Sequence, residues 1–401
     1  MKYIILLGDG MADYPLKELG NKTPLQVAQT ESMDAIAGRG TLGMVQTIPQ
    51  GLSPGSDIAN LSILGYDPRC YLTGRAVYEA ASAGVKLTPH DVAFRCNLVT
   101  LGEQDKTIVM EDYSAGHIST EEARQIVSDL DRHLGTDQIR FYPGVSYRHL
   151  MVWKEGTEAV ETTPPHDISG RDITSYLPRG KGSGTINTLL IEARTILKEH
   201  HVNRERVSAA QRPANAIWLW GQGKPITLPS FREKYGLRGS VISAVDLIKG
   251  IGITLGLSPV EVPGATGYLD TNYEGKAAYA LKELEDKDFV FLHVEAPDEA
   301  SHSGSVTNKI KAIEDFDRRV VKNVLEGMVR FSEYKMMVLP DHRTPIVKKT
   351  HTEEPVPFAF VSSKDVANNP RKDAAFNELS AQESGLFVEQ GCSLMDLLIK
   401  G

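Results

Sequence analysis

Short apolar runs that each lead to an aspartate constrain the fold of this chain more than any other feature. Tyr3–Leu7 precedes Asp9, Asp288–Val294 precedes Asp298, and Met336–Leu339 precedes Asp341. Apolar runs of this length, closed by Gly or Pro, are typical of buried strands. Ligands of open α/β sheets bind at the carboxyl ends of the strands. We therefore expect the three aspartates to meet at one edge of a sheet.

Helical patterns alternate with these and other strands along the chain. Helices are expected at Thr23–Ala37, Ile58–Leu64, Thr120–His133, Gly184–His200, Ala277–Leu284 and Met395–Ile399. Further strands are expected at Val92–Leu101, Thr107–Met110, Tyr147–Trp153, Ala216–Trp220, Ser240–Leu247 and, as the last one, Phe358–Val361. The alternation predicts an α/β protein with a doubly wound, mostly parallel sheet. Residues 155–184, rich in Pro, Gly, Thr and Ser, are expected to form a long functional loop or lid.

Composition narrows the class of partner. A chain of 401 residues is long enough for two domains, or for one large α/β domain with an insertion. A net charge of -8 and the absence of a block of like charge argue against nucleic-acid and membrane partners, so we expect a small-molecule substrate. Three widely spaced cysteines without a CxxC pair fit a reducing compartment. The apolar amino terminus is too short for a signal segment, and we expect a cytoplasmic protein.

Carboxylates and imidazoles near the predicted strand ends suggest a metal site. His302 follows Asp298 by four residues, so both side chains would lie on one face of a helical turn. His342 is adjacent to Asp341, and His351 follows on the same loop. Together with Asp9 these residues supply six ligands, which suits two divalent ions about 3.5 to 4 Å apart. The alternatives are an Asx-turn at Asp9, a capping Asp298 and a hydrogen-bonded Asp-His loop.

Ser56 is the candidate nucleophile. It lies at the N-cap or in the first turn of the expected helix after the small-residue loop 51–55, where free backbone N–H groups suit a phosphate. The alternative is an ordinary helix cap. A bound dication stabilises a serine alkoxide, and this favours phosphoryl transfer. No GxSxG elbow indicates acyl transfer, no GxxxxGK[ST] loop occurs, and residues 53–57 lack the Arg of a sulfatase motif.

A series of motifs along nearly the whole chain resembles one known family. They are GDGMAD, KTPLQVAQT, SPGSDIANLSILGYDP, the segment Gly74–Ala80, DVAFRCNLVTL, DYSAGHIS, YRHLMVW, KGIG, FVFLHVEAPDEASH, PDH and HTEEPVPF. The chain resembles the alkaline phosphatase superfamily, and within it the archaeal-type cofactor-independent phosphoglycerate mutases. The resemblance implies a discontinuous metal-binding domain of alkaline-phosphatase type, residues 1–88 and 228–401, with an inserted α+β substrate-binding cap at residues 89–227.

The resemblance also implies a division of the ligands. One ion would be held by Asp298, His302 and His351, and the other by Asp9, Asp341, His342 and Ser56. The ions would be Mn, Zn, Co or Mg, and no organic cofactor is expected. The residues that resemble the family's substrate contacts are Arg75, Arg95, Arg148, His149 and Lys249.

The activity implied is interconversion of 3-phosphoglycerate and 2-phosphoglycerate through a phosphoserine on Ser56, without 2,3-bisphosphoglycerate. Such an isomerase serves glycolysis and gluconeogenesis. A homoserine kinase, a phosphatase or another phosphotransferase on the same scaffold stays open, as does a non-catalytic module that binds metals or metabolites. The sequence leaves the oligomeric state open.

Overall fold

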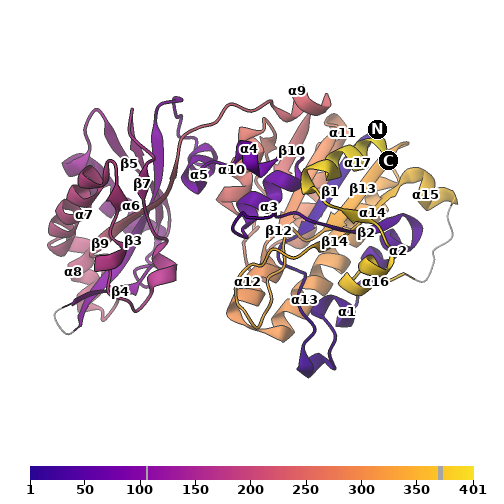
Figure 1. Ribbon diagram of the computed structural model, residues 1–401, viewed down its shortest axis with the longest axis horizontal. Coiled ribbons are helices and arrows are strands. Elements are labelled where there is room, and N and C mark those ends of the chain that lie inside the picture. The colour runs from indigo at the N-terminus through magenta and orange to yellow at the C-terminus, as the bar shows by residue number, and fades with distance from the viewer. Residues whose placement is uncertain (105–106, 369–373) are drawn as a thin grey trace. The chain divides into compact units, whose positions relative to one another are not determined.

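The computed structural model describes residues 1–104, 107–368 and 374–401. Two compact units divide the chain (Figure 1): unit 1 is Met1–Leu72 with Leu228–Gly401, and unit 2 is Thr73–Thr227. The resemblance places the first boundary later, between residues 88 and 89. The difference arises because α5 (Arg75–Ser82) packs against β3 (Val92–Gln104) and β9 (Ala216–Gly223), which are strands of unit 2.

Unit 1 is built on an eight-stranded sheet in the order β11-β10-β12-β1-β13-β14-β2-β15. All neighbours in it are parallel except β14, which is antiparallel to both β13 and β2. The fold class predicted from the alternating pattern is thus confirmed. The bounds are β1 Lys2–Gly8, β2 Thr41–Val45, β10 Gly239–Ile242, β11 Ser258–Pro259, β12 Phe289–Val294, β13 Tyr334–Leu339, β14 Val356–Ser362 and β15 Phe387–Val388.

The central strands of this sheet are buried along almost their whole length. Every residue of β12 and β13 is buried, as is every residue of β1 except Lys2. Continuous apolar runs of this kind occur where helices cover both faces of a parallel sheet. The sequence therefore reads as unbroken apolar stretches rather than as an alternation of polar and apolar residues.

Two groups of mutually contacting helices belong to unit 1. One group is α2 (Glu31–Arg39), α11 (Tyr273–Asp286), α13 (Val306–Phe316), the π-helical turn η4 (Asp317–Val321) and α14 (Lys322–Met328). Another contains α3 (Ser56–Ile63) and α10 (Asp246–Thr254), with α3 also contacting α4 (Pro68–Tyr71). Helices α1 (Pro24–Val27) and α12 (Ala296–Ser303) also contact α13. The other α-helices described in unit 1 are α9 (Phe231–Tyr235), α15 (Ser363–Asn368), α16 (Glu378–Glu383) and α17 (Leu394–Lys400).

The prediction of one helix over Thr23–Ala37 is wrong. The structure has α1 and α2 with a break at residues 28–30. The first turn of α2 is capped from another part of the chain, because the Asp317 carboxylate accepts hydrogen bonds from the backbone N–H of Ser32 (3.1 Å) and Met33 (2.7 Å). The break therefore depends on a tertiary contact that the local sequence does not contain.

Two further expectations for unit 1 need correction. Strand β10 ends at Ile242, and the rest of the predicted strand leads into α10, the helix that carries Lys249. Val356–Ser362 is not the last strand, since Phe387–Val388 pairs in parallel with β2. Within the described ranges, no helix is both long and apolar enough to cross a membrane.

Unit 2 is an antiparallel sheet with helices packed against it. The long strand β3 pairs with β4 (Thr107–Asp112), β6 (Arg148–Trp153) and β9, and β6 pairs with β5 (Ile139–Val145). Helix α6 (Thr120–Leu134) starts at a capping box of Ser119 and Glu122 and contacts β5, while α7 (Ser183–Lys198) contacts β9. A further helix, α8 (His201–Ser208), contacts α6.

The segment 155–184, expected to be a loop or lid, is folded onto unit 2. It contains the paired short strands β7 (Val160–Glu161) and β8 (Arg179–Gly180), and two 3₁₀ turns. Ile168 and Ile173 are buried and pack in one cluster with Trp218 and Trp220 of β9. Its apolar residues were thus too few for a periodic pattern but enough to anchor the segment. Whether it acts as a lid stays a prediction.

Candidate active site

Strands β12, β1 and β13 are neighbouring parallel strands of the unit 1 sheet (Figure 1), and an acidic residue follows each of them at the same edge. Asp9 follows β1, Glu295 follows β12 and Asp341 follows β13 after one proline. In register, Gly8 lies beside Val294 and Leu7 beside Leu339, so the three strands end level with one another. The expectation that Asp9 and Asp341 lie at the same carboxyl edge agrees with this register.

Asp9, Asp341, His342 and Ser56 form the first cluster. The Nε2 atom of His342 lies 3.1 Å from Ser56 Oγ, 3.4 Å from Asp341 Oδ2 and 3.6 Å from Asp9 Oδ1. Asp9, Asp341 and His342 are fully buried. The structure thus brings together all four residues that the resemblance assigns to one ion.

Asp298, His302 and His351 form the second cluster. Asp298 and His302 are four residues apart on α12, and His302 Nε2 lies 3.1 Å from Asp298 Oδ2. His351 Nε2 lies 3.6 Å from Asp298 Oδ1 and 3.0 Å from His302 Nε2. The two clusters are continuous, because the rings of His342 and His351 are 4.0 Å apart between centroids.

Burial and neighbouring charges shift the pKa values of three proposed ligands, Asp9, Asp298 and His342. Burial is the main cause that raises the pKa of Asp9 well above its ordinary value, and the charge of the neighbouring Asp341 adds to it. Burial also acts to raise the pKa of Asp298, but the hydrogen bonds of His302 and His351 outweigh it and the pKa falls well below the usual range. Burial lowers the pKa of His342 to about 4, which keeps its imidazole neutral. The first cluster therefore combines a buried carboxyl of raised pKa with a neutral imidazole, and a bound dication would stabilise the ionised form of that carboxyl.

The residues present fit divalent ions. Asp9 Oδ1 is buried and has no hydrogen-bond partner within the protein. The Nδ1 atom of His302 lies 2.9 Å from the carbonyl oxygen of Lys349, which leaves Nε2 for a metal. Carboxylate oxygens and imidazole nitrogens suit Mn, Zn, Co and Mg to different degrees. His342 lies close enough to share an ion with Asp9 and Asp341, but it also lies close enough to share one with Asp298 and His351. The division of the ligands between two ions therefore stays a prediction.

Ser56 is the first residue of α3, and Gly55 is the N-cap. The side-chain amide of Asn60, one turn further along, donates to Ser56 O (2.8 Å) and to Asp341 Oδ2 (3.0 Å). Asn60 is fully buried and therefore ties the start of α3 to the loop after β13. The N-cap is thus not Ser56, whose hydroxyl lies 3.1 Å from His342 Nε2.

Four of the five predicted substrate contacts lie in unit 2. Arg95 is buried; its Nε donates to Glu79 Oε2 at 2.9 Å and its guanidinium stacks over Trp220 at 4.2 Å. Arg75 Nε lies 3.6 Å from the other oxygen of Glu79. Burial lowers the pKa of Arg95 to about 10, and the nearby Glu79 carboxylate offsets part of this effect. The guanidinium therefore stays charged at neutral pH.

Two further cationic or polar groups of unit 2 lie on β6. The guanidinium of Arg148 is exposed and lies 5.5 Å from the ring of Tyr147. His149 is buried, and its Nδ1 accepts a hydrogen bond from Gly144 N at 2.9 Å. Its proton is therefore on Nε2, a buried donor without a partner in the protein. The fifth predicted contact, Lys249, lies in unit 1 and pairs with Glu261 at 2.8 Å.

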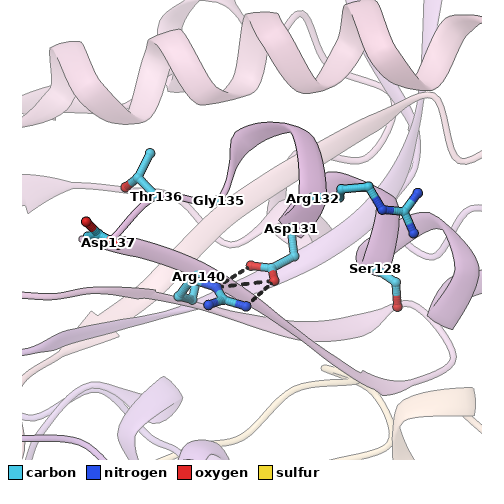
Figure 2. Close-up of a pocket in the computed structure, with 7 residues that line it drawn as sticks. All are labelled: Ser128, Asp131, Arg132, Gly135, Thr136, Asp137 and Arg140. Carbon is cyan, nitrogen blue, oxygen red and sulfur yellow. Dashed lines mark hydrogen bonds and ion pairs between the residues drawn. The ribbon is translucent and has the colours of Figure 1, made fainter.

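A surface depression on unit 2 contains none of the predicted residues (Figure 2). Figure 2 shows the guanidinium of Arg140 directed at the Asp131 carboxylate. The nitrogen–oxygen distances between the two groups are 2.6 to 3.2 Å. Arg132, which also lines the depression, pairs with Asp129 at 2.7 Å. Since both arginines are neutralised by aspartates, we assign no anion site to this depression.

Comparisons with known proteins decide the family. Residues 37–203 match the family model described as 2,3-bisphosphoglycerate-independent phosphoglycerate mutase. A protein from Geobacter sulfurreducens is 53% identical over 399 residues, and the 2,3-bisphosphoglycerate-independent phosphoglycerate mutase of Methanosarcina acetivorans is 53% identical over 403 residues. Both alignments cover 100% of each chain. The chain belongs to this mutase family.

Solved structures of similar proteins share the fold. A protein from Pyrococcus horikoshii has a TM-score of 0.83 at 28% identity, covering 100% of this chain and 96% of the other. The cofactor-independent phosphoglycerate mutase of Thermoplasma acidophilum has a TM-score of 0.66 at 28% identity, covering 100% and 99%. The family resemblance inferred from the motifs is thus confirmed, and the protein is an enzyme of the phosphoglycerate mutase family.

Sequence reasoning missed several residues that the mutase fold brings to the site. His293 is fully buried, and its Nε2 lies 2.8 Å from Asp9 Oδ2 and 3.5 Å from Glu295 Oε2. Asp9, His293 and Glu295 form a third compact group of possible ligands. Because His293 lies inside the apolar run of β12, the pattern presents it as part of a strand; only its position one residue before the strand end could have indicated the site. Asn60 and Thr344, whose hydroxyl lies 3.1 Å from His342 Nδ1, gave no signal in the sequence.

Proposed function

We propose that this protein interconverts 3-phosphoglycerate and 2-phosphoglycerate, with Ser56 as the nucleophile that carries the phosphoryl group and without 2,3-bisphosphoglycerate. The observation that carries the proposal is the position of the Ser56 hydroxyl, 3.1 Å from His342 Nε2 among buried carboxylates and imidazoles. Full-length identity of 53% to a named mutase supports the substrate. Such an activity belongs to glycolysis and gluconeogenesis, and we expect it in the cytoplasm.

We propose two divalent ions as the cofactors. Asp298, His302 and His351 would hold one, and Asp9, Asp341, His342 and Ser56 the other. When bound, these ions would favour the ionised Ser56 hydroxyl and neutralise the charge of the phosphoryl oxygens. The chain's own residues then have to orient the hydroxyl, bind the substrate and exclude water.

The reaction consists of two transfers of one phosphoryl group. Ser56 Oγ loses its proton and attacks the phosphorus of 3-phosphoglycerate, the bond from phosphorus to the substrate oxygen breaks, and that oxygen takes up a proton. The C2 hydroxyl of the same glycerate then loses its proton and attacks the phosphoserine, the bond from phosphorus to Ser56 Oγ breaks, and Oγ takes up a proton. Atoms and protons balance over the two steps, and no external phosphate donor is needed.

Retention of glycerate separates a mutase from a phosphatase. Water that reached the phosphoserine would hydrolyse it, so the glycerate has to be held between the two transfers. We propose Arg75, Arg95, Arg148, His149 and Lys249 for contacts to the carboxylate and phosphate. Charge-assisted hydrogen bonds from arginine suit both groups. In unit 2, the buried and unpartnered Nε2–H of His149 and the exposed guanidinium of Arg148 support this assignment.

The test is an enolase-coupled assay with 3-phosphoglycerate as the only phosphorylated compound. We expect formation of 2-phosphoglycerate that needs neither nucleotide nor 2,3-bisphosphoglycerate, that stops with a chelator and that returns with added Mn²⁺. Release of inorganic phosphate in place of 2-phosphoglycerate would identify a phosphatase. Phosphorylation of homoserine with ATP would identify a kinase. Metal binding with none of these activities would point to a non-catalytic protein.

A further inference from the structure

One buried hydroxyl contacts a residue from each of the two clusters. Thr344 follows the Asp341-His342 pair and is fully buried. Its Oγ1 lies 2.5 Å from Asp298 Oδ1 and 3.1 Å from His342 Nδ1. Asp298 belongs to the second cluster and His342 to the first, so a single oxygen atom connects the two.

The direction of these hydrogen bonds follows from the chemistry of the three groups. An ionised carboxylate can only accept, so the Thr344 hydroxyl donates its one proton to Asp298. The hydroxyl oxygen can then only accept at its other contact, and the proton of the neutral His342 imidazole must be on Nδ1. If the Thr344 hydroxyl donated to His342 Nδ1 instead, its oxygen and the Asp298 carboxylate would face each other as two acceptors at 2.5 Å. The Nε2 lone pair of His342 is thereby directed at Ser56, Asp341 and Asp9.

The backbone of Thr344 is fixed by unit 1 itself. Its N–H donates to Ala12 O at 3.2 Å, and its carbonyl accepts from the buried Lys309 ammonium at 3.0 Å. A Cβ added at Gly10 would lie 2.6 Å from the hydroxyl oxygen, so the side chain has no free space on that side. Both ends of the residue are therefore held in place, as a group that orients metal ligands requires.

We propose that Thr344 is a positioning residue shared by the two metal clusters: its hydroxyl orients the Asp298 carboxylate and sets the tautomer of His342, so that each offers its ligand atom to a divalent ion. This inference rests on the proposed metal sites and adds to them. It predicts that the two sites depend on one hydroxyl and lose affinity together.

The experiment compares Thr344→Val, which keeps the shape and removes the hydroxyl, with Thr344→Ser, which keeps the hydroxyl. Mn²⁺ binding to the metal-free full chain is titrated and the bound ions are counted. We expect Thr344→Val to weaken binding of both ions by about 10- to 100-fold, as loss of a group that orients a ligand does elsewhere. Thr344→Ser should stay close to the unchanged protein.

A matched control is Thr47→Val, because Thr47 is also buried and its hydroxyl has no partner in the protein. It should bind Mn²⁺ normally. Thermal unfolding of each metal-free variant shows whether it is folded, and a Thr344→Val protein that fails to fold is replaced by Thr344→Ala. Two ions bound with unchanged affinity by the hydroxyl-free variant would overturn the proposal, and so would weakening of one ion only. Failure of the mutase assay with normal metal binding would instead count against the proposed function.

Discussion

At the scale of single residues, Gly10 shows how tightly the site is built. Its φ of +61° lies in the left-handed region, and its N–H donates to Asp341 Oδ1 at 3.1 Å. An added Cβ would lie 2.5 Å from Asp298 Oδ1. A side chain at this position is thus opposed by the backbone conformation and by a proposed metal ligand.

Gly10→Ala should therefore weaken metal binding as well as stability. Gly20→Ala is the matched control, because Gly20 has a φ of +67° and nothing within 4 Å of an added Cβ. We expect the control to cost about 1 to 2 kcal/mol for the backbone alone. Gly10→Ala should cost more and lower Mn²⁺ affinity, measured by urea unfolding and titration. Equal effects of the two substitutions would show that the contact with Asp298 is unimportant.

His149 provides a pH prediction for unit 2. Burial lowers its pKa to about 3, whereas the unfolded chain has a histidine pKa of about 6.5. Between these two pH values the unfolded chain binds a proton at His149 that the folded chain does not. The contribution of neutral His149 to folding stability is therefore complete above about pH 6.5 and is lost as the pH falls toward about 3. The loss is up to about 1.4 kcal/mol per pH unit.

Urea unfolding followed by tryptophan fluorescence measures this dependence, because Trp153, Trp218 and Trp220 all lie in unit 2. His149→Asn should reduce the fall in stability between about pH 6.5 and about pH 5.5. The exposed His133, substituted in the same way, should leave it unchanged. The same pH dependence in all three proteins would refute a neutral buried His149.

The site residues that the sequence could predict are those with a positional signal. Asp9 and Asp341 follow apolar runs, and the spacing of Asp298 and His302 fits one helical turn. His293 could not be found in this way, because it lies within such a run. Thr344 is an ordinary loop threonine until the fold places its hydroxyl between Asp298 and His342.

At the scale of elements, a buried ion pair joins α13 to the loops that carry the site. Lys309 on α13 is fully buried, and its Nζ lies 2.8 Å from Asp13 Oδ2 and 3.0 Å from Thr344 O. Asp13 Oδ2 also accepts from the backbone N–H of Ile346 at 3.2 Å. The helix thus holds the loop after β1 and the loop after β13 together.

Lys309→Met should destabilise the protein by about 3 to 5 kcal/mol, because it leaves the Asp13 carboxylate buried without a cation. The double variant Lys309→Met with Asp13→Asn removes both charges and should recover part of that loss. Denaturant unfolding of the two variants and the unchanged protein gives both values. A double variant less stable than the single one would contradict this explanation.

Element types followed from periodicity, whereas sheet order and some helix ends did not. The unbroken apolar runs of β1, β12 and β13 predict a parallel sheet. Nothing local to β14 shows that it runs antiparallel to both neighbours. The start of α2 depends on Asp317, which is far away in the sequence. Contacts between distant segments therefore account for the errors.

At the scale of the whole molecule, the proposed metal ligands and the tryptophans belong to different units. All seven proposed ligands lie in unit 1, and all three tryptophans lie in unit 2. Ligands that bind only the folded state stabilise it by mass action. We therefore expect Mn²⁺ to act on the stability of unit 1.

Hydrogen exchange of peptides can resolve the two units. At Mn²⁺ about 100-fold above its dissociation constant, peptides from β1 and β13 should gain up to about 2.7 kcal/mol of protection per ion bound. Peptides from β3 and β6 should change little. Protection that rises equally in both sets, or only in unit 2, would contradict a metal site confined to unit 1.

The central claim is that the Ser56 hydroxyl carries the phosphoryl group. The most direct measurement is mass spectrometry of the Mn²⁺-loaded enzyme, acid-quenched during turnover of 3-phosphoglycerate, alongside Ser56→Ala and the same-loop control Ser53→Ala. We expect phosphate on Ser56 in the unchanged enzyme and in Ser53→Ala, with neither phosphoserine nor 2-phosphoglycerate formed by Ser56→Ala. Normal production of 2-phosphoglycerate by Ser56→Ala would contradict it.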